Sequence, residues 1–200
     1  MSGQLIISIG REFGSGGHDI ARALAERFSL PLYKENMLNA IAERQGIQTE
    51  RLSPYDETPT NRLIFRTVNG FNNAPSDALA HLQFQFLRDQ AAEGRSFVVL
   101  GRCSEEVLKD CSGLISIFVL ADIGFKVARI LEQGAASRDE ALTLMAVRDR
   151  KRKYYHNQYC RGKWGDSRNY DLCVKSSQLG IPATVDLLET YIRSRINTPK

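Results

Sequence analysis

The feature that most constrains the fold of this chain is a glycine-rich segment between an apolar run and an amphipathic helical pattern. Residues 5–9 (LIISI) are apolar, residues 10–19 (GREFGSGGHD) hold the glycines, and apolar side chains then recur at helical spacing over residues 20–28. A strand, a glycine loop and a helix in this order direct several backbone N–H groups and the positive helix end toward one point. Such a loop binds phosphate, and glycine allows the close approach that a Cβ atom would block. A tight turn without a ligand uses the same residues, so the segment alone leaves both interpretations open.

Neither common phosphate-binding signature is complete in this segment. In the pattern G-x-x-x-x-G-K-[ST], aligned on Gly16, the first glycine falls on Arg11 and the lysine falls on Gly17. The dinucleotide pattern G-x-G-x-x-G, aligned on Gly14, has Asp19 where the third glycine belongs. The loop therefore lacks the cation that usually acts on a bound phosphate.

The missing lysine has to be replaced if the loop takes part in phosphoryl transfer. A cation on the transferring phosphate contributes roughly 10³–10⁵ in rate. Arg11 and His18 are the candidates within the segment. Arg11 is the better candidate because its guanidinium is always charged and donates from two nitrogens at once.

Three further runs are rich in branched residues and show little polar alternation, which is typical of strands buried on both faces. They are residues 97–100 (FVVL), 114–121 (LISIFVLA) and 172–174 (LCV). The apolar positions of the intervening helical patterns are Ile20, Ala21, Leu24, Ala25 and Phe28, then Phe125, Ala128 and Leu131, then Val185, Leu188 and Ile192. Pro182 suits the first turn of the last helix. Strands that alternate with helices predict an α/β domain with helices on both faces of a parallel sheet.

Two segments interrupt this alternation. Residues 48–93 contain several prolines, an Asn-Gly loop and a helical stretch over residues 77–92, with no convincing strand. We expect a mostly helical insertion there. Residues 148–168 are strongly basic and aromatic. With no internal repeat, the sequence predicts a single domain over residues 1–200 that carries both segments.

A second anion-binding signal is Gly101-Arg102, directly after the predicted strand at residues 97–100. Ligands of open α/β sheets bind at the carboxyl edge of the parallel strands, where this arginine falls. The alternative is a structural arginine that caps a nearby carbonyl group.

The basic segment at residues 148–168 gives a third signal. On a helix, Arg148, Arg152, Tyr155 and Tyr159 share one face. A charge run of this kind is commonly a solvated surface, and basic residues interleaved with tyrosines also suit RNA binding. The segment is short and no RNA-binding fold surrounds it, so an arginine-bearing lid over a phosphate donor fits its position better.

Composition narrows the class of protein further. The chain has 200 residues, 42% of them hydrophobic and 25% charged, and its net charge of +4 suits an anionic ligand. Its four cysteines form no C-x-x-C pair and its histidines do not cluster, so the sequence predicts neither a zinc site nor a disulfide framework. Reduced thiols, no signal-peptide pattern and no long apolar run predict a cytoplasmic protein without a membrane partner.

Four blocks of the sequence together resemble the cytidylate kinase-like family, relatives of bacterial cytidylate kinase among the nucleoside monophosphate kinases. The blocks are ISIGREFGSGGHDIARALAERF, LPLYKENMLNAIAERQGI, VVLGRCSEEVLKD and RDRKRKYYHNQYCRGKWGDSRNYDLCVKSSQLGI. The resemblance covers nearly the whole chain and is weakest over residues 48–93.

The resemblance implies a P-loop kinase-like fold with three α/β/α layers and a five-stranded parallel sheet, whose second strand is residues 30–33. It implies that residues 48–93 are a helical insertion for the acceptor and residues 148–168 an arginine-rich lid. ATP and Mg²⁺ are the implied cofactors, nucleotides are the implied partners, and residues 176–179 would lie near the donor base. The implied donor-phosphate loop comprises Gly14, Ser15, Gly16, Gly17, His18 and Asp19. The expected catalytic arginines are Arg102, facing the acceptor, Arg148 and Arg152 in the lid, and Arg11 as the replacement cation.

The chain departs from the cytidylate kinase pattern at two places. Where that pattern reads G-S-G-K-G-T, residues 14–19 read GSGGHD, and where it reads G-R-D, residues 101–103 read GRC. We expect phosphoryl transfer from ATP to a nucleoside monophosphate, with a CMP-like acceptor first. The alternative is a nucleotide-binding protein without kinase activity that acts as a conformational switch. A stable nucleic-acid partner is not expected.

Overall fold

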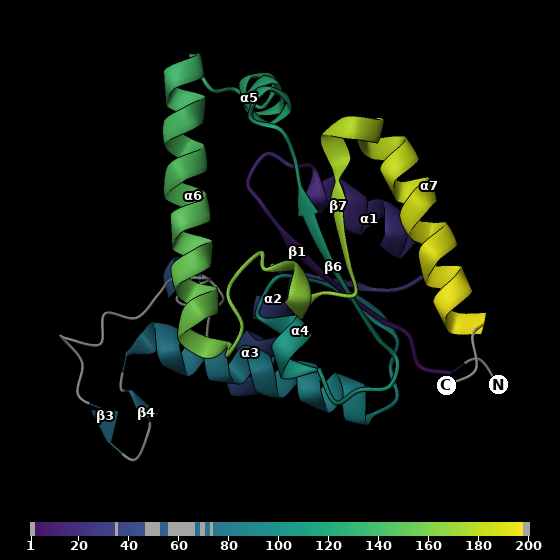
Figure 1. Cartoon of the computed structure of the whole chain (residues 1–200). Helices are drawn as coiled ribbons and strands as arrows, with labels where there is room; N and C mark the ends of the chain where they lie inside the picture. The colour runs from purple at the N-terminus through teal and green to yellow at the C-terminus, as the bar shows by residue number, and fades with distance from the viewer. Residues whose placement is uncertain are drawn as a thin grey trace.

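The chain forms a five-stranded parallel sheet with helices on both faces (Figure 1). The computed structural model describes residues 3–34, 36–46, 53–55, 67–68, 71–72 and 74–197. The strands of the sheet, in spatial order, are β2 (Leu32–Tyr33), β5 (Phe97–Leu100), β1 (Ile6–Arg11), β6 (Leu114–Leu120) and β7 (Leu172–Lys175). The helices are α1 (Gly17–Arg27), α2 (Asn36–Gln45), α3 (Pro75–Ala92), α4 (Ser104–Val107), α5 (Ile123–Glu132), α6 (Arg138–Tyr159) and α7 (Ser176–Asn197). Short 3-10 turns, η2 (Ser53–Tyr55) and η3 (Ser167–Asn169), complete the described elements together with a small hairpin, β3 (Thr67–Val68) and β4 (Phe71–Asn72).

The central strands are apolar at nearly every position because a hydrophobic core covers each face of the sheet. Ile7 and Ile9 of β1 pack with α1 and α7 on one face, whereas Ile6 packs with α2 and α3 on the other face. Successive side chains of a strand point to opposite faces, so a central strand buried on both faces has no polar alternation. The predicted three-layer α/β/α fold with five parallel strands is therefore confirmed.

Strand β1 lies in the middle of the sheet and pairs with β5 on one side and β6 on the other. Its residue Ile7 lies opposite Val98 of β5 and Ile115 of β6. All three strands end at the same edge of the sheet because they are parallel. The glycine-rich segment and Arg102 therefore leave the sheet side by side.

Helix α6 stands beside the sheet and bridges α5 and α3 (Figure 1). Near its start, Ala141 and Met145 pack against Val127 and Ile130 of α5. Near its end, Tyr155 packs in a cluster with residues of α3. Residues 148–159 of the basic segment thus form the second half of a 22-residue helix.

The insertion at residues 48–93 is only partly described. The predicted helix at residues 77–92 is confirmed as α3, which has Pro75 in its first turn. The expectation of no strand is wrong, because β3 and β4 form a two-residue antiparallel ladder. Such a ladder is too short to produce a period-two pattern in the sequence.

Two helices differ in detail from the sequence expectation. The buried positions of α5 are Lys126, Val127 and Ile130, so the predicted stripe of Phe125, Ala128 and Leu131 was the wrong face. In α7, Val185, Leu188 and Ile192 are buried as predicted. Gly180 interrupts α7 with φ 73° and ψ 169°, and Pro182 lies in the first turn after this kink. None of the described helices is long and apolar enough to cross a bilayer.

Candidate active site at the glycine loop

The glycine loop joins β1 to α1 with the geometry of an anion-binding turn. Gly14 and Gly16 both have φ 78°, a left-handed conformation that disfavours other residues. Helix α1 begins at Gly17, and no side chain of the described residues caps its N-terminus. The first N–H groups of a helix have no partner within the helix, and they bind anions well when no cap occupies them.

The centre of the loop is held rigidly by hydroxyl groups. The buried Ser15 donates from Oγ to the carbonyl oxygen of Glu12 at 2.8 Å. Ser176, at the start of α7, donates from Oγ to the carbonyl oxygen of Ser15 at 2.6 Å. These bonds fix the loop between β1 and α7. Preorganisation of this kind lowers the cost of ordering the loop around a ligand.

Each glycine of the loop also faces another part of the chain at close range. A Cβ atom on Gly16 would lie 2.0 Å from Ile181 of α7, and one on Gly14 would lie 3.1 Å from the Cβ atom of Lys126. A Cβ atom on Gly17 would lie 2.6 Å from the Cβ atom of Arg11. A side chain at any of these positions would therefore crowd a neighbour, most firmly at Gly17, where the neighbouring atom is the Cβ atom of Arg11.

The last of these contacts places Arg11 beside the position of the missing lysine. Arg11 ends β1, and its side chain begins where a side chain on Gly17 would begin. His18 is exposed instead, and its Nε2 atom lies 3.1 Å from Nζ of Lys34. Of the two candidates within the segment, Arg11 is the one that shares space with position 17.

Helix α5 supplies two further cations that the sequence did not single out. Lys126 is buried, and its Nζ donates to Oε2 of Glu12 at 2.9 Å. Arg129, one turn later, forms an ion pair with Asp19. Neither residue was predicted, because a helical pattern of apolar residues indicates only which positions face the core.

A pocket opens at the carboxyl ends of β1 and β5, next to the loop. Its lining residues are Gly10, Arg11, Gly101, Arg102, Cys103, Glu105, Arg152, Tyr155, His156, Trp164 and Tyr170. Three of the four predicted catalytic arginines, Arg11, Arg102 and Arg152, are thus brought together. Arg148 is exposed on α6 and is not among the described residues that line this pocket.

Arg102 and Cys103 have an unusual backbone for residues with side chains. Their φ angles are 62° and 54°, and Cys103 precedes the short helix α4. Two consecutive left-handed residues cost stability and are concentrated at functional sites. This conformation keeps Arg102 in the pocket wall with only 5% of its surface exposed.

Helix α6 contacts the glycine loop directly. Asp149 accepts a hydrogen bond from the backbone N–H of Phe13 at 2.7 Å. Arg152 donates to the carbonyl oxygen of Arg11 at 3.4 Å, and its guanidinium lies over the Phe13 ring. Burial raises the pKa of Asp149 against the effect of its hydrogen bond to Phe13. The basic segment therefore reaches both the loop and the pocket.

Two of the three tyrosines of α6 pack inward, whereas Tyr154 is 65% exposed. Tyr155 is buried, and Tyr159 stacks edge-on against Phe84 of α3 with its hydroxyl on Asp77 at 2.8 Å. Neither ring presents an open face of the kind that base stacking requires. This packing gives the alternative of RNA binding no support from the two tyrosines.

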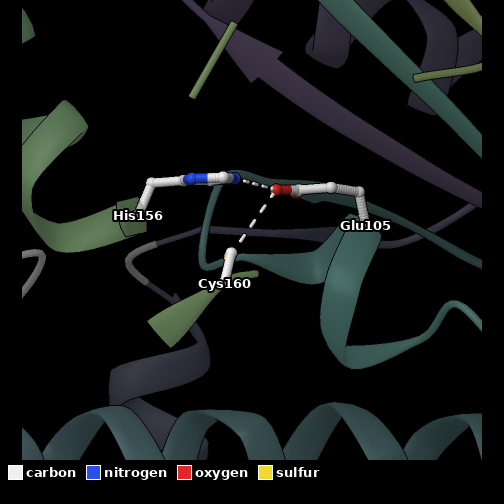
Figure 2. Close-up of side chains that lie close together, drawn as sticks. All are labelled: Glu105, His156 and Cys160. Atoms are coloured by element: carbon white, nitrogen blue, oxygen red, sulfur yellow. Dashed lines mark hydrogen bonds and ion pairs between the residues drawn. The ribbon is translucent and has the colours of Figure 1, made fainter. Parts of the chain in front are cut away.

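The pocket also contains a carboxylate and an imidazole that the sequence analysis did not predict. Glu105 of α4 accepts from Nε2 of His156 at 2.6 Å, and the Cys160 thiol approaches the same carboxylate (Figure 2). Burial lowers the pKa of His156, but contacts with Cys160 and Glu105 overcome this effect and raise it to about 10. The sequence contained a signal for Glu105. The cytidylate kinase pattern has a carboxylate at the position of Cys103, and Glu105 lies two residues after that position.

Comparison with known proteins places this geometry in a family. The chain is similar to a solved structure of an uncharacterized protein from Eubacterium ventriosum ATCC 27560, which is 38% identical with a TM-score of 0.76 over 96% of this chain and 99% of that chain. A shikimate kinase from Bacteroides thetaiotaomicron shares the fold at 14% identity, with a TM-score of 0.54 over 94% of this chain and 98% of that chain. A putative kinase from Chloroflexus aurantiacus does so at 15% identity, with a TM-score of 0.52 over 97% and 98%. A comparison with curated proteins finds no match.

The family assignment rests on nearly the whole chain. The profile of the cytidylate kinase-like family matches residues 6–178. This range runs from the first residue of β1 to the first turn of α7, and it contains the glycine loop, the three pocket arginines and the basic segment. The chain belongs to the cytidylate kinase-like family.

Proposed function

We propose that this protein transfers the γ-phosphoryl group of ATP to a nucleoside monophosphate, with a CMP-like acceptor first. The observation that carries the proposal is the meeting of Arg11, Arg102 and Arg152 in one pocket beside an uncapped helix N-terminus. Phosphoryl transfer needs positioning and positive charge more than it needs a protein nucleophile. Membership of a kinase-like family supports the same reaction.

The donor phosphates bind at the glycine loop in this proposal. Backbone N–H groups over residues 14–19 hold the phosphate oxygens at the start of α1. Arg11 replaces the missing lysine, because its side chain begins beside Gly17. Lys126 forms an ion pair with Glu12, so in this proposal it contributes positive charge near the loop without binding a phosphate directly.

Two pocket arginines serve the transferred group and the acceptor. Arg102 lies at the end of β5 and faces the acceptor, whereas Arg152 reaches from α6. A guanidinium donates to phosphate from two nitrogens and neutralises charge that develops during transfer. Residues 148–168 act as the lid in this proposal, and residues 48–93 hold the acceptor.

The residues around the loop fit the Mg²⁺ ion that a kinase of this type uses. Mg²⁺ prefers oxygen ligands and is commonly held by one or two carboxylates plus phosphate oxygens. Glu12 and Asp19 are carboxylates of the glycine-rich segment itself, and each forms an ion pair with a cation of α5. When bound, Mg²⁺ neutralises the charge of the donor phosphates. Glu12 and Asp19 would hold the ion and its water ligands in place.

The direct test is incubation of pure protein with Mg-ATP and each of CMP, dCMP, UMP, AMP and GMP. Formation of ADP together with a nucleoside diphosphate supports the proposal. Shikimate serves as a control acceptor, because the shikimate kinases share only the fold. No product from any monophosphate at high enzyme concentration would overturn the catalytic claim.

Two substitutions make this test specific to the site. Arg11→Met and Arg102→Met are each expected to lower kcat/KM by about 10³-fold, since each removes a cation from a phosphate. Lys153→Gln removes an exposed cation of α6 and is expected to leave the rate unchanged. Equal loss in all three variants would point to a general effect of net charge.

The second candidate function is nucleotide binding without transfer, in which the protein changes conformation on binding. The contact of Ile181 with Gly16 favours it, because a kinked helix α7 touches the loop that would hold the phosphates. Titration calorimetry with ATP distinguishes the two functions. Binding without turnover supports the switch, and absence of binding rejects both.

A further inference from the structure

Two side chains that line the pocket, Glu105 and His156, form a cluster with Cys160, and the proposed kinase function assigns this cluster no role. Glu105 extends from α4, and His156 reaches toward it from the end of α6 (Figure 2). Cys160, the residue directly after α6, approaches the same carboxylate (Figure 2). Glu105 and His156 are separated by 51 positions in the sequence, so only the fold brings the cluster together.

The distances within the cluster suit a metal ion. Nε2 of His156 lies 2.6 Å and Sγ of Cys160 lies 4.0 Å from the same oxygen of Glu105. The three possible ligand atoms all lie within 4.8 Å of one another. A tetrahedral zinc site has N, O and S ligands about 3.3–3.8 Å apart, given metal–ligand bonds of about 2.0–2.3 Å. Small rotations of the side chains bring the three atoms to these separations.

The chemistry of the ligands selects the class of metal. A thiolate and an imidazole prefer zinc and its neighbours in the transition series, whereas Mg²⁺ and Ca²⁺ prefer oxygen ligands. One carboxylate and one thiolate balance the charge of a divalent ion. This balance matters because Arg102 and Arg152 line the same pocket and would oppose an uncompensated cation.

We propose that Glu105, His156 and Cys160 bind a divalent transition metal of the zinc class. The ion takes the place of the proton shared between His156 Nε2 and Glu105 Oε1, and the thiol of Cys160 loses its proton on binding. Three protein ligands leave one tetrahedral position for water or for an oxygen of a ligand in the pocket. Because Glu105 belongs to α4, His156 to the last turn of α6 and Cys160 directly follows α6, the ion joins these two helices.

The test is a titration of the full chain, freed of metal and fully reduced, with Co²⁺ in the absence of nucleotide. Binding of one Co²⁺ with a thiolate-to-metal charge-transfer band and tetrahedral visible bands is expected. Zn²⁺ should displace the Co²⁺, and excess Mg²⁺ should not. A wild-type spectrum without the thiolate band would overturn the proposal. Since no nucleotide or acceptor is present, this outcome is independent of the kinase proposal.

Matched variants assign the band to the cluster. Cys160→Ser should abolish it, and Glu105→Gln and His156→Asn should each weaken binding at least about tenfold. Cys111→Ser removes a thiol from a different part of the fold and should retain the full band. A band that persists in Cys160→Ser would contradict the assignment.

The thermal unfolding temperature is a second measurement, and it distinguishes loss of metal binding from poor folding of a variant. Zn²⁺ should raise the thermal unfolding temperature of the wild-type protein and of Cys111→Ser, because a ligand that binds only the folded state stabilises it. It should raise that of Glu105→Gln less at the same Zn²⁺ concentration, because binding to this variant is weaker. A shift of equal size in all three proteins would show that the ion binds elsewhere and would overturn the proposal.

Discussion

Arg11 and Gly17 show why the phosphate-binding signature is incomplete in this chain. The usual phosphate-binding loop has a glycine at the position of Arg11 and a lysine at the position of Gly17. The two positions share one space, since a Cβ atom on Gly17 would lie 2.6 Å from that of Arg11. The arginine at position 11 and the glycine at position 17 therefore depend on each other, because a long side chain fits at only one of the two positions.

Restoring the lysine alone should disrupt the loop. We expect Gly17→Lys to lower the free energy of unfolding by about 1–3 kcal/mol, because it crowds Arg11. The double variant Arg11→Gly with Gly17→Lys should recover most of this loss. Urea unfolding of the two single variants and the double variant measures the coupling.

Gly124 provides a control for this experiment. It lies in the first turn of α5, as Gly17 lies in the first turn of α1, and has no neighbour within 4 Å of a built Cβ atom among the described residues. Gly124→Lys should therefore cost little. Additive effects of the Arg11 and Gly17 substitutions would contradict the shared space.

Asp149 gives a residue-scale prediction of pH dependence. Burial raises its folded-state pKa above the usual value of 3.8, so its ionisation opposes folding. This penalty is present at neutral pH and disappears as the pH falls through the folded pKa toward 3.8. Asp149→Asn should raise the unfolding temperature at pH 7 while it keeps an oxygen for the N–H of Phe13.

The gain from Asp149→Asn should shrink as the solution is made acidic and vanish below the normal carboxyl pKa. Thermal unfolding between neutral and acidic pH measures this trend. Asp110→Asn, at an exposed position, should show no comparable gain. A benefit of Asp149→Asn that grows toward low pH would refute the assigned cause.

At the scale of elements, α6 is the part of the molecule that touches both proposed ligand sites. Its residue Asp149 holds the glycine loop, and Arg152 and His156 line the pocket. Its packing on α5 at one end and on α3 at the other keeps these contacts in register. The helix therefore positions donor-side and acceptor-side groups together.

Substitution of two arginines one turn apart on α6 can distinguish the effect of a cation that lines the pocket from the effect of the net charge of the protein. Arg152→Gln is expected to lower kcat/KM for the phosphoryl transfer by about 10³-fold, since it removes a cation from the pocket. Arg148→Gln should lower it far less, because Arg148 is exposed and outside the pocket lining. Steady-state kinetics of the two variants decide the point, and equal losses would show that the exposed arginine also reaches the substrate.

The kink of α7 can be tested as an element by itself. Gly180 has φ 73° and ψ 169°, a region that essentially only glycine occupies, and no described atom lies within 4 Å of its built Cβ atom. Gly180→Ala should therefore lower the free energy of unfolding by about 1–3 kcal/mol through backbone strain alone. Gly3→Ala, which lacks both strain and neighbours, should be close to neutral in the same urea titration.

At the scale of the whole molecule, the sheet was predictable because its three central strands, β1, β5 and β6, are buried on both faces. Runs such as residues 97–100 then contain no polar residue, and the flanking helices are amphipathic. The face of α5 was not predictable in this way. Its buried position at Lys126 is satisfied by Glu12 from another element, and no local pattern reports such a partner.

The candidate site also contains residues that the sequence could place and residues whose positions depend on contacts between distant elements. Arg11, Arg102 and the glycines follow predicted strands directly, so the sequence places them at one edge of the sheet. Arg148 shares a helix face with Arg152 in the sequence pattern, but the path of α6 brings only Arg152 to the pocket. The partnership of Glu105 with His156 depends on how α6 returns to α4, and spacing in the sequence contains no information on that contact.

The shared space of Arg11 and Gly17 also restricts the order in which one loop can have changed into the other. A route that gains the arginine before the lysine is lost passes through a crowded loop with both long side chains. A route through glycine at both positions passes through a loop that folds easily but has no cation of its own. A protein on the second route would have needed a cation from outside the loop segment to act on a bound phosphate.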